Sequence, residues 1–219
     1  MNTQTQPAIG IYGGTFDPVH FGHLRPALEV CETLGLEQIR FIPSYIPPHR
    51  QTPETSIENR LLMLETAISS EKCFVMDQRE IKRQGHSYML DTLKSLKNDF
   101  LDQPLCLILG LDAFLEINTW HCWEKLLSYC HFVVTRRPET EYDEISSWPP
   151  ELQKLYQQHK AEHADELHKQ LVGKIFFMHV TQLPISSSLI RQQLKNKLSI
   201  RYLLPDAVYD IITEKQLYL

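Results

Sequence analysis

Two histidines three positions apart, His20 and His23, follow a glycine pair at Gly13 and Gly14. An apolar stretch precedes the glycines, and a helical pattern begins near Phe21. Glycines after a strand let the backbone approach a ligand closely, and the free N–H groups of a helix start attract an anion. Two imidazoles on one side of that helix start would add charge and hydrogen-bond donors. The pattern favours stabilisation of a phosphoryl transition state, where positioning and charge neutralisation dominate catalysis.

The His-x-x-His spacing by itself has simpler explanations. A glycine turn with two surface histidines is the commoner one, and metal ligation is a further rival. The spacing is not the His-Glu-x-x-His of zinc proteases, and no carboxylate is evident that could serve as the third ligand beside the two histidines. The complete string around it, GGTFDPVHFGH at residues 13–23, favours the functional interpretation.

A second phosphate-directed pattern, ISSSLIR, occupies residues 185–191. Its three serines precede an apolar-periodic helix that runs to about Lys197, and serines are good helix N-caps. Capping alone would explain one serine. Three hydroxyls and free N–H groups, with Arg191 one turn later, form a better cradle for phosphate.

A glycine and a carboxylate, Gly110 and Asp112, follow another apolar stretch at 105–109. The glycine would let an adenosine lie against the backbone, and Asp112 could accept a hydrogen bond from a ribose hydroxyl. Helix N-capping explains Asp112 equally well from spacing alone. Trp120 and Trp123 follow, and a tryptophan is by default a core residue.

Three further segments carry polar groups that could meet a substrate. Ser87 and Tyr88 are predicted to open a helix whose N–H groups could receive a carboxylate. The proline-rich segment 47–50 cannot be regular structure. Arg136 and Arg137 place cations at a strand end, although surface arginines are usually only solvated, and the sequence does not say which one contacts phosphate.

The elements that must position these groups alternate between strand and helix along the chain. Strands are predicted at 8–12, 39–42, 73–76, 105–109, 131–135 and 175–178. Such alternation predicts an α/β, Rossmann-like fold with a mainly parallel sheet flanked by helices. Ligands of such sheets bind beyond the carboxyl ends of the strands, so the loops above are expected to meet there. We expect one domain over 1–219, with a surface insertion at 138–170 and a helical segment at 186–219.

Composition narrows the class of protein. The formal net charge of −5 over 219 residues argues weakly against a nucleic-acid partner. The five cysteines are odd in number and without Cys-x-x-Cys spacing, as expected of reduced thiols in the cytoplasm rather than of a zinc site. Residues 1–7 are polar and are not expected to form a signal peptide, and no apolar run approaches the length of a membrane span.

The string at 13–23 resembles the nucleotidyltransferase superfamily that carries His-x-Gly-His after its first strand. Within it, the chain resembles the bacterial nicotinate-mononucleotide adenylyltransferases. The resemblance continues, in order, through 43–50, 87–93, 110–120, 136–138, 185–191 and the closing helix after Leu204-Pro205. It implies transfer of AMP from ATP to nicotinate mononucleotide in NAD biosynthesis, giving nicotinate adenine dinucleotide and pyrophosphate. Mg²⁺ would arrive with ATP, held mostly by phosphates and water.

The resemblance also implies roles for single residues. It gives catalytic roles to His20, His23 and Arg191. The implied ATP-binding residues are Gly13, Gly14, Thr15, Phe16, His20, His23, Gly110, Asp112, Ile185, Ser187, Ser188 and Arg191. The implied nicotinate mononucleotide-binding residues are His49, Arg50, Ser87, Tyr88, Met89, Trp120 and Arg137. Trp120 would stack on the pyridine ring, which leaves Trp123 to packing.

The chain departs from the family pattern at two positions. Ser188 replaces a threonine and keeps the hydroxyl. Met89 also replaces a threonine, in the helix start proposed to receive the carboxylate. If backbone N–H groups bind the carboxylate, as we favour, Met89 does not affect recognition. If the threonine hydroxyl binds it in the family, its loss here weakens the preference for nicotinate over nicotinamide.

Four other readings compete with this one. A phosphopantetheine adenylyltransferase usually lacks a histidine at the position of His20 and the Pro-Pro-His segment. A nicotinamide-mononucleotide enzyme stays open because of Met89. A non-catalytic nucleotide sensor could lose the histidines and Arg191, which are intact here. A class I aminoacyl-tRNA synthetase would need a second lysine-rich signature and an anticodon-binding domain. The sequence does not give the oligomeric state.

Overall fold

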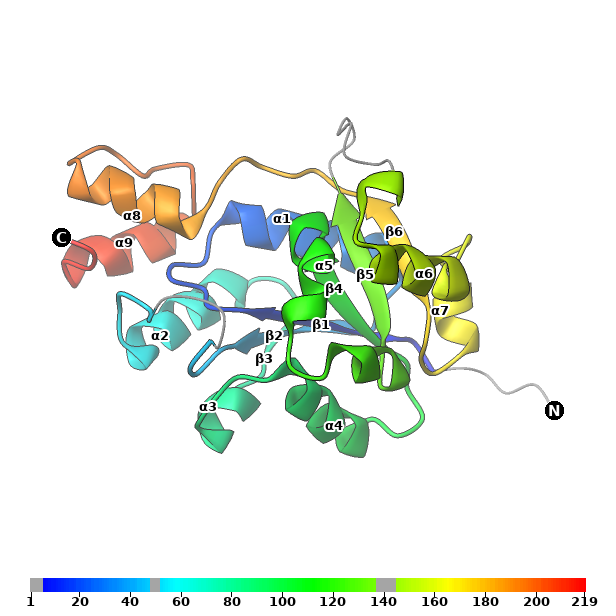
Figure 1. The fold of residues 1–219 in the computed structure, drawn as a ribbon. Coiled ribbons are helices and arrows are strands. Elements are labelled where there is room, and N and C mark those ends of the chain that lie inside the picture. The colour runs from blue at the N-terminus through cyan, green and yellow to red at the C-terminus, as the bar shows by residue number, and fades with distance from the viewer. Residues whose placement is uncertain (1–5, 48–51, 137–144) are drawn as a thin grey trace.

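Apolar stretches separated by helical patterns fold into one parallel sheet, with strand order β3-β2-β1-β4-β5-β6 (Figure 1). The computed structural model describes residues 6–47, 52–136 and 145–219. The strands are β1 (Ile9–Gly14), β2 (Gln38–Pro43), β3 (Phe74–Met76), β4 (Leu105–Gly110), β5 (His131–Arg136) and β6 (Ile175–His179). The order reverses between β1 and β4, and a crevice for ligands forms at such a switch point. The predicted fold class is confirmed.

Helices cover both faces of the sheet, with α1 above it and α4 below it in Figure 1. The α-helices are α1 (Phe21–Leu34), α2 (Ile57–Ile68), α3 (Arg79–Arg83), α4 (Met89–Asp99), α5 (Leu111–Leu115), α6 (Pro150–His159), α7 (Glu166–Lys169), α8 (Ser187–Lys195) and α9 (Asp206–Glu214). Short 3₁₀ helices are η1 (Ile117–Thr119), η2 (Trp123–Ser128) and η4 (Ile145–Ser147). This arrangement leaves the ends of the strands open to ligands.

The core consists of two layers, one on each face of the sheet. Along β4, Leu105, Leu107 and Leu109 belong to one buried cluster, and Cys106 and Ile108 belong to the other. Successive strand residues point to opposite faces, and a parallel sheet is apolar on both. A sheet buried on both faces is a rigid base for the loops that leave its carboxyl ends.

One helix start differs from the prediction. The helix expected from Ser87 begins at Met89, two residues later. The Ser87 N–H donates to the carbonyl of Ile46 (2.9 Å), and the Tyr88 N–H donates to that of His86 (3.0 Å). Residues 45–47 and 86–87 therefore pair through the backbone, a contact between distant segments that overrides the local helical pattern.

The segment predicted as an insertion, 138–170, packs on the core through its described part. Trp148 and Leu152 are buried, and the Trp148 ring stacks on Phe177 of β6 with centroids 5.4 Å apart. Beyond α6, the Ala161 N–H donates to the carbonyl of Ile175 (2.8 Å), which pairs the chain with the outer edge of β6 at its first residue. This segment thus packs on the core and meets the edge of the sheet at one point.

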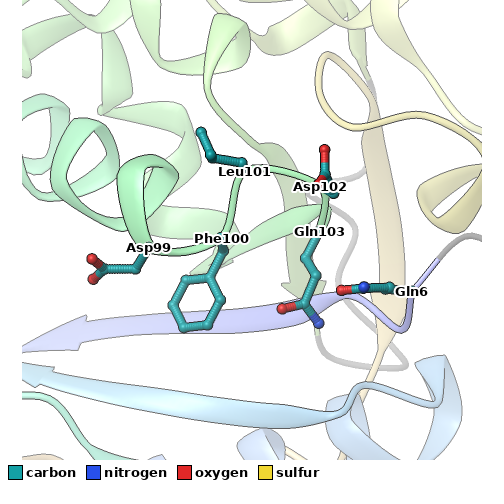
Figure 2. Close-up of a pocket in the computed structure, with 6 residues that line it drawn as sticks. All are labelled: Gln6, Asp99, Phe100, Leu101, Asp102 and Gln103. Atoms are coloured by element: carbon teal, nitrogen blue, oxygen red, sulfur yellow. The ribbon is translucent and has the colours of Figure 1, made fainter.

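A small cavity of about 250 Å³ lies where α4 turns into β4, before the amino end of that strand (Figure 2). Its lining residues are Gln6, Asp99, Phe100, Leu101, Asp102 and Gln103. Two carboxylates in so small a space suit neither a phosphate nor a nucleotide. The cavity therefore does not compete with the large cleft described next.

Candidate active site

A cleft of about 910 Å³ lies beyond the carboxyl ends of β1 and β4. With the exception of Arg136, the sequence-predicted site residues within the described ranges line it: Gly13, Gly14, Thr15, Phe16, His20, His23, Ser87, Tyr88, Met89, Gly110, Asp112, Trp120, Ile185, Ser187, Ser188 and Arg191. His49, Arg50 and Arg137 lie outside the described residues. Arg136 ends β5, and it is not among the residues that line the cleft.

His20 and His23 stack on each other, with ring centroids 3.8 Å apart and planes inclined by 29°. His20 is the N-cap residue of α1, in extended conformation, and only 4% of it is exposed. Among the described residues, none forms a hydrogen bond with its buried Nδ1. Burial lowers the pKa of His20 to about 4, so the ring is neutral near pH 7 until an anion enters. The residue lines the cleft, so its ring is suited to contact a ligand there.

A buried arginine, Arg60 of α2, fixes the start of the histidine loop. Its Nη1 donates to the carbonyls of Thr15 (2.8 Å) and Ser44 (2.9 Å), and the residue is 1% exposed. Burial lowers the pKa of the guanidinium, although the Asp17 carboxylate opposes this. Sequence reasoning missed Arg60. The available signal is its position one turn from Leu64 on the apolar face of α2.

Asp17 connects the histidine loop with three other segments. One carboxylate oxygen, Oδ2, accepts from the Glu54 N–H (2.7 Å), and Oδ1 accepts from the Tyr218 hydroxyl (2.7 Å). Its carbonyl accepts from Arg191 Nη1 (2.7 Å). Asp17 is 2% exposed; its bond to Tyr218 is buried, and its bonds to Glu54 and Arg191 are partly buried. The sequence analysis quoted Asp17 within its motif but gave it no role.

The start of α8 faces the histidine loop across the cleft. Ser186 is the N-cap, with Oγ accepting from the Leu189 N–H (3.1 Å). Ser187 Oγ donates to the carbonyl of Pro18 (2.9 Å), which joins the helix to the loop. The first N–H groups of a helix have no intrahelical acceptor. Ser186 caps the helix, and all three serines line the cleft.

Close approach of the backbone requires a glycine at position 22. A Cβ on Gly22 would lie 2.8 Å from the carbonyl oxygen of Ile185 and 2.9 Å from Nδ1 of His20. A Cβ on Gly110 would meet only the side chain of Asp112, which can move. Gly22 thus permits α1 to begin directly against the segment that leads into α8.

Aromatic rings line the part of the cleft near α4. Tyr88 and His121 lie with ring centroids 4.4 Å apart, next to Trp120. Trp123 packs against the core, as predicted. Sequence reasoning missed His121, for which adjacency to Trp120 is the one available signal. Flat rings of this kind suit a planar aromatic ligand.

A buried glutamate, Glu80 of α3, stands behind these rings. Its Oε1 accepts from the Thr92 hydroxyl (2.5 Å), and the residue lines the cleft while being 4% exposed. Burial raises the pKa of Glu80. Ser87 Oγ accepts from the Tyr45 N–H (2.8 Å), which ties the loop after β2 to this wall. The sequence analysis gave Glu80 no role.

The remaining side-chain chemistry is limited. Within residues 6–47, 52–136 and 145–219, no three His, Cys, Asp or Glu side chains cluster so that they could hold a metal ion. All five cysteines are free thiols. No helix in the described part of the chain combines the length and apolarity needed to cross a bilayer.

Comparisons with known proteins show which proteins the chain is similar to. The model of the family described as cytidylyltransferase-like matches residues 11–193. A relative from Methylococcus capsulatus is 46% identical over 211 residues, covering 96% of this chain and 99% of that protein. Another from Psychromonas ingrahamii is 41% identical over 213 residues, covering 97% and 98%. Both bear the name probable nicotinate-nucleotide adenylyltransferase.

A solved structure shares the fold. The nicotinic acid mononucleotide adenylyltransferase of Plasmodium falciparum, complexed with NaAD, superposes with a TM-score of 0.73 at 20% identity. The superposition covers 97% of this chain and 98% of that one. At this identity the likeness establishes the fold alone.

Proposed function

The chain belongs to the cytidylyltransferase-like family and, within it, to the nicotinate-nucleotide adenylyltransferases, and from this we propose that it transfers AMP from ATP to nicotinate mononucleotide. The products are nicotinate adenine dinucleotide and pyrophosphate, a step of NAD biosynthesis. One observation supports this most directly. The stacked pair His20 and His23 and the start of α8 line one cleft at the switch point between β1 and β4.

In the proposed reaction, a phosphate oxygen of nicotinate mononucleotide attacks the α-phosphorus of ATP in line. A bond forms between that oxygen and the α-phosphorus, and the bond to the bridging oxygen of the β-phosphate breaks. Pyrophosphate leaves with the electron pair, so no protein nucleophile is needed. Catalysis then depends on positioning and on neutralising the charge of the transferring phosphate.

His20 and His23 would neutralise charge on the transferring phosphate. Approach of a polyphosphate would favour the protonated form of His20, which opposes the effect of burial on its pKa. Arg191 and the N–H groups at the start of α8 would hold the leaving pyrophosphate, with hydroxyls of Ser187 and Ser188 beside them. Mg²⁺ would arrive with ATP, because the described carboxylates form no cluster able to hold it.

The two substrates would occupy opposite parts of the cleft. The adenosine of ATP would lie against Gly110 and Asp112, with Gly13, Gly14, Thr15, Phe16 and Ile185 nearby. The pyridine ring would stack on Trp120, beside Tyr88. His49, Arg50 and Arg137, outside the described residues, remain proposed contacts of the mononucleotide.

The carboxylate of nicotinate would be read by the start of α4. The Ser87 and Tyr88 N–H groups already donate to carbonyls, so they are not the groups that we propose to bind the carboxylate. The first N–H groups of α4, those of Met89 and Leu90, have no intrahelical acceptor, so they would bind the carboxylate. Recognition would thus remain with the backbone.

We further propose that residues 1–219 act as one domain in the cytoplasm, where the free thiols would stay reduced. ATP and nicotinate mononucleotide would be the partners, and we propose neither nucleic acid nor a membrane surface.

Pyrophosphate release from Mg-ATP tests the function, with nicotinate mononucleotide, nicotinamide mononucleotide and phosphopantetheine assayed side by side. The expected result is turnover with a large preference for the acid. Equal turnover of the acid and the amide would leave the proposed reaction unchanged and would show that the enzyme accepts both mononucleotides. Turnover of phosphopantetheine alone, or of none of the three, would overturn the proposal.

A further inference from the structure

The Tyr218 hydroxyl donates to Oδ1 of Asp17 at 2.7 Å, although the two residues are 201 positions apart. Tyr218 follows α9, and 8% of it is exposed. Burial and the adjacent Asp17 carboxylate raise the pKa of the phenol well above its usual value. The hydroxyl therefore keeps its proton and stays a donor at every working pH.

The backbone at Tyr218 is held in an unusual conformation. Its φ is +65°, in the left-handed region that bulky side chains seldom adopt. Gln216 has φ of +52°, and the Leu217 N–H donates to the carbonyl of Ile212 (3.0 Å). Such conformations persist where surrounding contacts over-determine them, and they cluster near functional sites. The turn directs the phenol inward to Asp17.

Both oxygens of the Asp17 carboxylate are thereby held. Tyr218 donates to one oxygen, and the Glu54 N–H donates to the other (2.7 Å). A carboxylate fixed at both oxygens also fixes the backbone of its residue. The Asp17 carbonyl accepts from Arg191 Nη1, and the next carbonyl along the chain accepts from Ser187. The distance between the histidine loop and α8 depends on these bonds.

We propose that Tyr218 is a positioning residue for AMP transfer, holding the histidine loop in register with Arg191 by way of Asp17. The inference rests on the proposed function. Tyr218 is not among the residues that line the cleft, so it contacts no substrate. Tyr218 would act on the relative position of two residues, His20, which contacts the transferring phosphate in the proposed reaction, and Arg191, which contacts the leaving pyrophosphate.

Loss of the hydroxyl would leave a buried carboxylate oxygen without its donor. Such an oxygen is costly, so the Asp17 side chain would rotate to find another partner. Rotation of Asp17 would displace the carbonyl that receives Arg191. Contacts that matter most in the transition state would weaken, and kcat would fall more than substrate affinity.

The variant Tyr218→Phe tests this, assayed well below the unfolding temperatures of both proteins. The expected result is a kcat about tenfold lower, with each KM changed by less than about threefold. Tyr202→Phe is the matched control, because Tyr202 lies in the same part of the chain and is 85% exposed. It should retain the wild-type kcat.

A double-mutant cycle with Asp17→Asn separates positioning from a general loss of stability. If Tyr218 acts through Asp17, the kcat of the double variant is close to that of the single variant with the lower kcat. Multiplied effects, or an unchanged kcat in Tyr218→Phe, would overturn the inference while leaving the function intact. A wild-type protein that releases no pyrophosphate would overturn the function and, with it, this inference.

Discussion

Arg191 and Glu54 form an ion pair in the cleft, with Nε and Oε1 2.8 Å apart. Lys195, one turn further along α8, contacts the other carboxylate oxygen at 2.8 Å. Hydrogen bonds from Lys195 and Arg191 hold the pKa of Glu54 below its usual value. A carboxylate therefore occupies the position that we assign to a phosphate of ATP.

Glu54→Gln should strengthen ATP binding, because it removes an anion that competes for Arg191. The Glu54 side chain is 37% exposed, and partly exposed ion pairs contribute little. We expect the KM for ATP to fall by a factor of about 1.5 to 5 at low salt. Asp165→Asn is the control, since it removes a surface pair with Lys169 far from the cleft. A higher KM for ATP in Glu54→Gln would mean that Glu54 assists binding.

His20→Ala and His23→Ala should each abolish most activity while the fold persists. Each removes a donor aimed at the charge that develops on the transferring phosphate, so kcat should fall roughly 10²–10³-fold. His163→Ala, a change at an exposed histidine outside the cleft, should leave kcat unchanged. Single-turnover kinetics and far-UV circular dichroism would be measured together. A variant with wild-type kcat would remove that histidine from the mechanism.

Stability should decline as the pH falls from about 6.5 toward 4. His131 is fully buried, its Nε2 lies 2.9 Å from the Gln170 carbonyl, and its Nδ1 accepts from the Lys174 N–H (3.0 Å). Burial lowers the pKa of His131 to about 4, as it does for His20. The unfolded chain thus binds these protons first, and stability is complete above the unfolded pKa and lost below it.

Chemical denaturation between pH 4 and pH 7.5 would measure this dependence. In His131→Gln, the decline in unfolding free energy should be shallower than in the wild type by up to roughly 3 kcal/mol across the interval. Parallel curves for the two proteins would show that His131 does not carry the effect.

Met89→Thr should leave the preference for nicotinate over nicotinamide mononucleotide unchanged within about twofold, because we propose that helix N–H groups bind the carboxylate. The ratio of the two kcat/KM values is the measurement. Met89→Leu separates the effect of side-chain size from that of a hydroxyl. A ratio that rises in the threonine variant alone would assign carboxylate recognition to that hydroxyl.

Local patterns predicted most elements because their signals are local. The helix predicted to begin near Phe21 does begin there, and the strand predicted at 39–42 lies within β2, because the apolar pattern of each lies within the element itself. The start of α4 was wrong because the Ile46 carbonyl takes the N–H of Ser87, 41 positions away. Pairing between distant segments leaves no local signature.

The same distinction applies to the site. Loops that follow strands were expected to converge, and the structure places the described ones on one cleft. Arg60, Glu80 and Tyr218 were missed because their partners, Thr15, Thr92 and Asp17, come from other elements. Each is a polar side chain that the fold buries, and the neighbouring residues in the sequence do not predict the burial of a single polar residue.

Both outer strands of the sheet are poor templates for joining another sheet. β3 has three residues, which is too short to recruit a partner strand. On the other side, the backbone at Lys160 and Ala161 already pairs with Ile175, the first residue of β6. A strand added from outside along the whole of β6 would first have to displace the 160–161 segment.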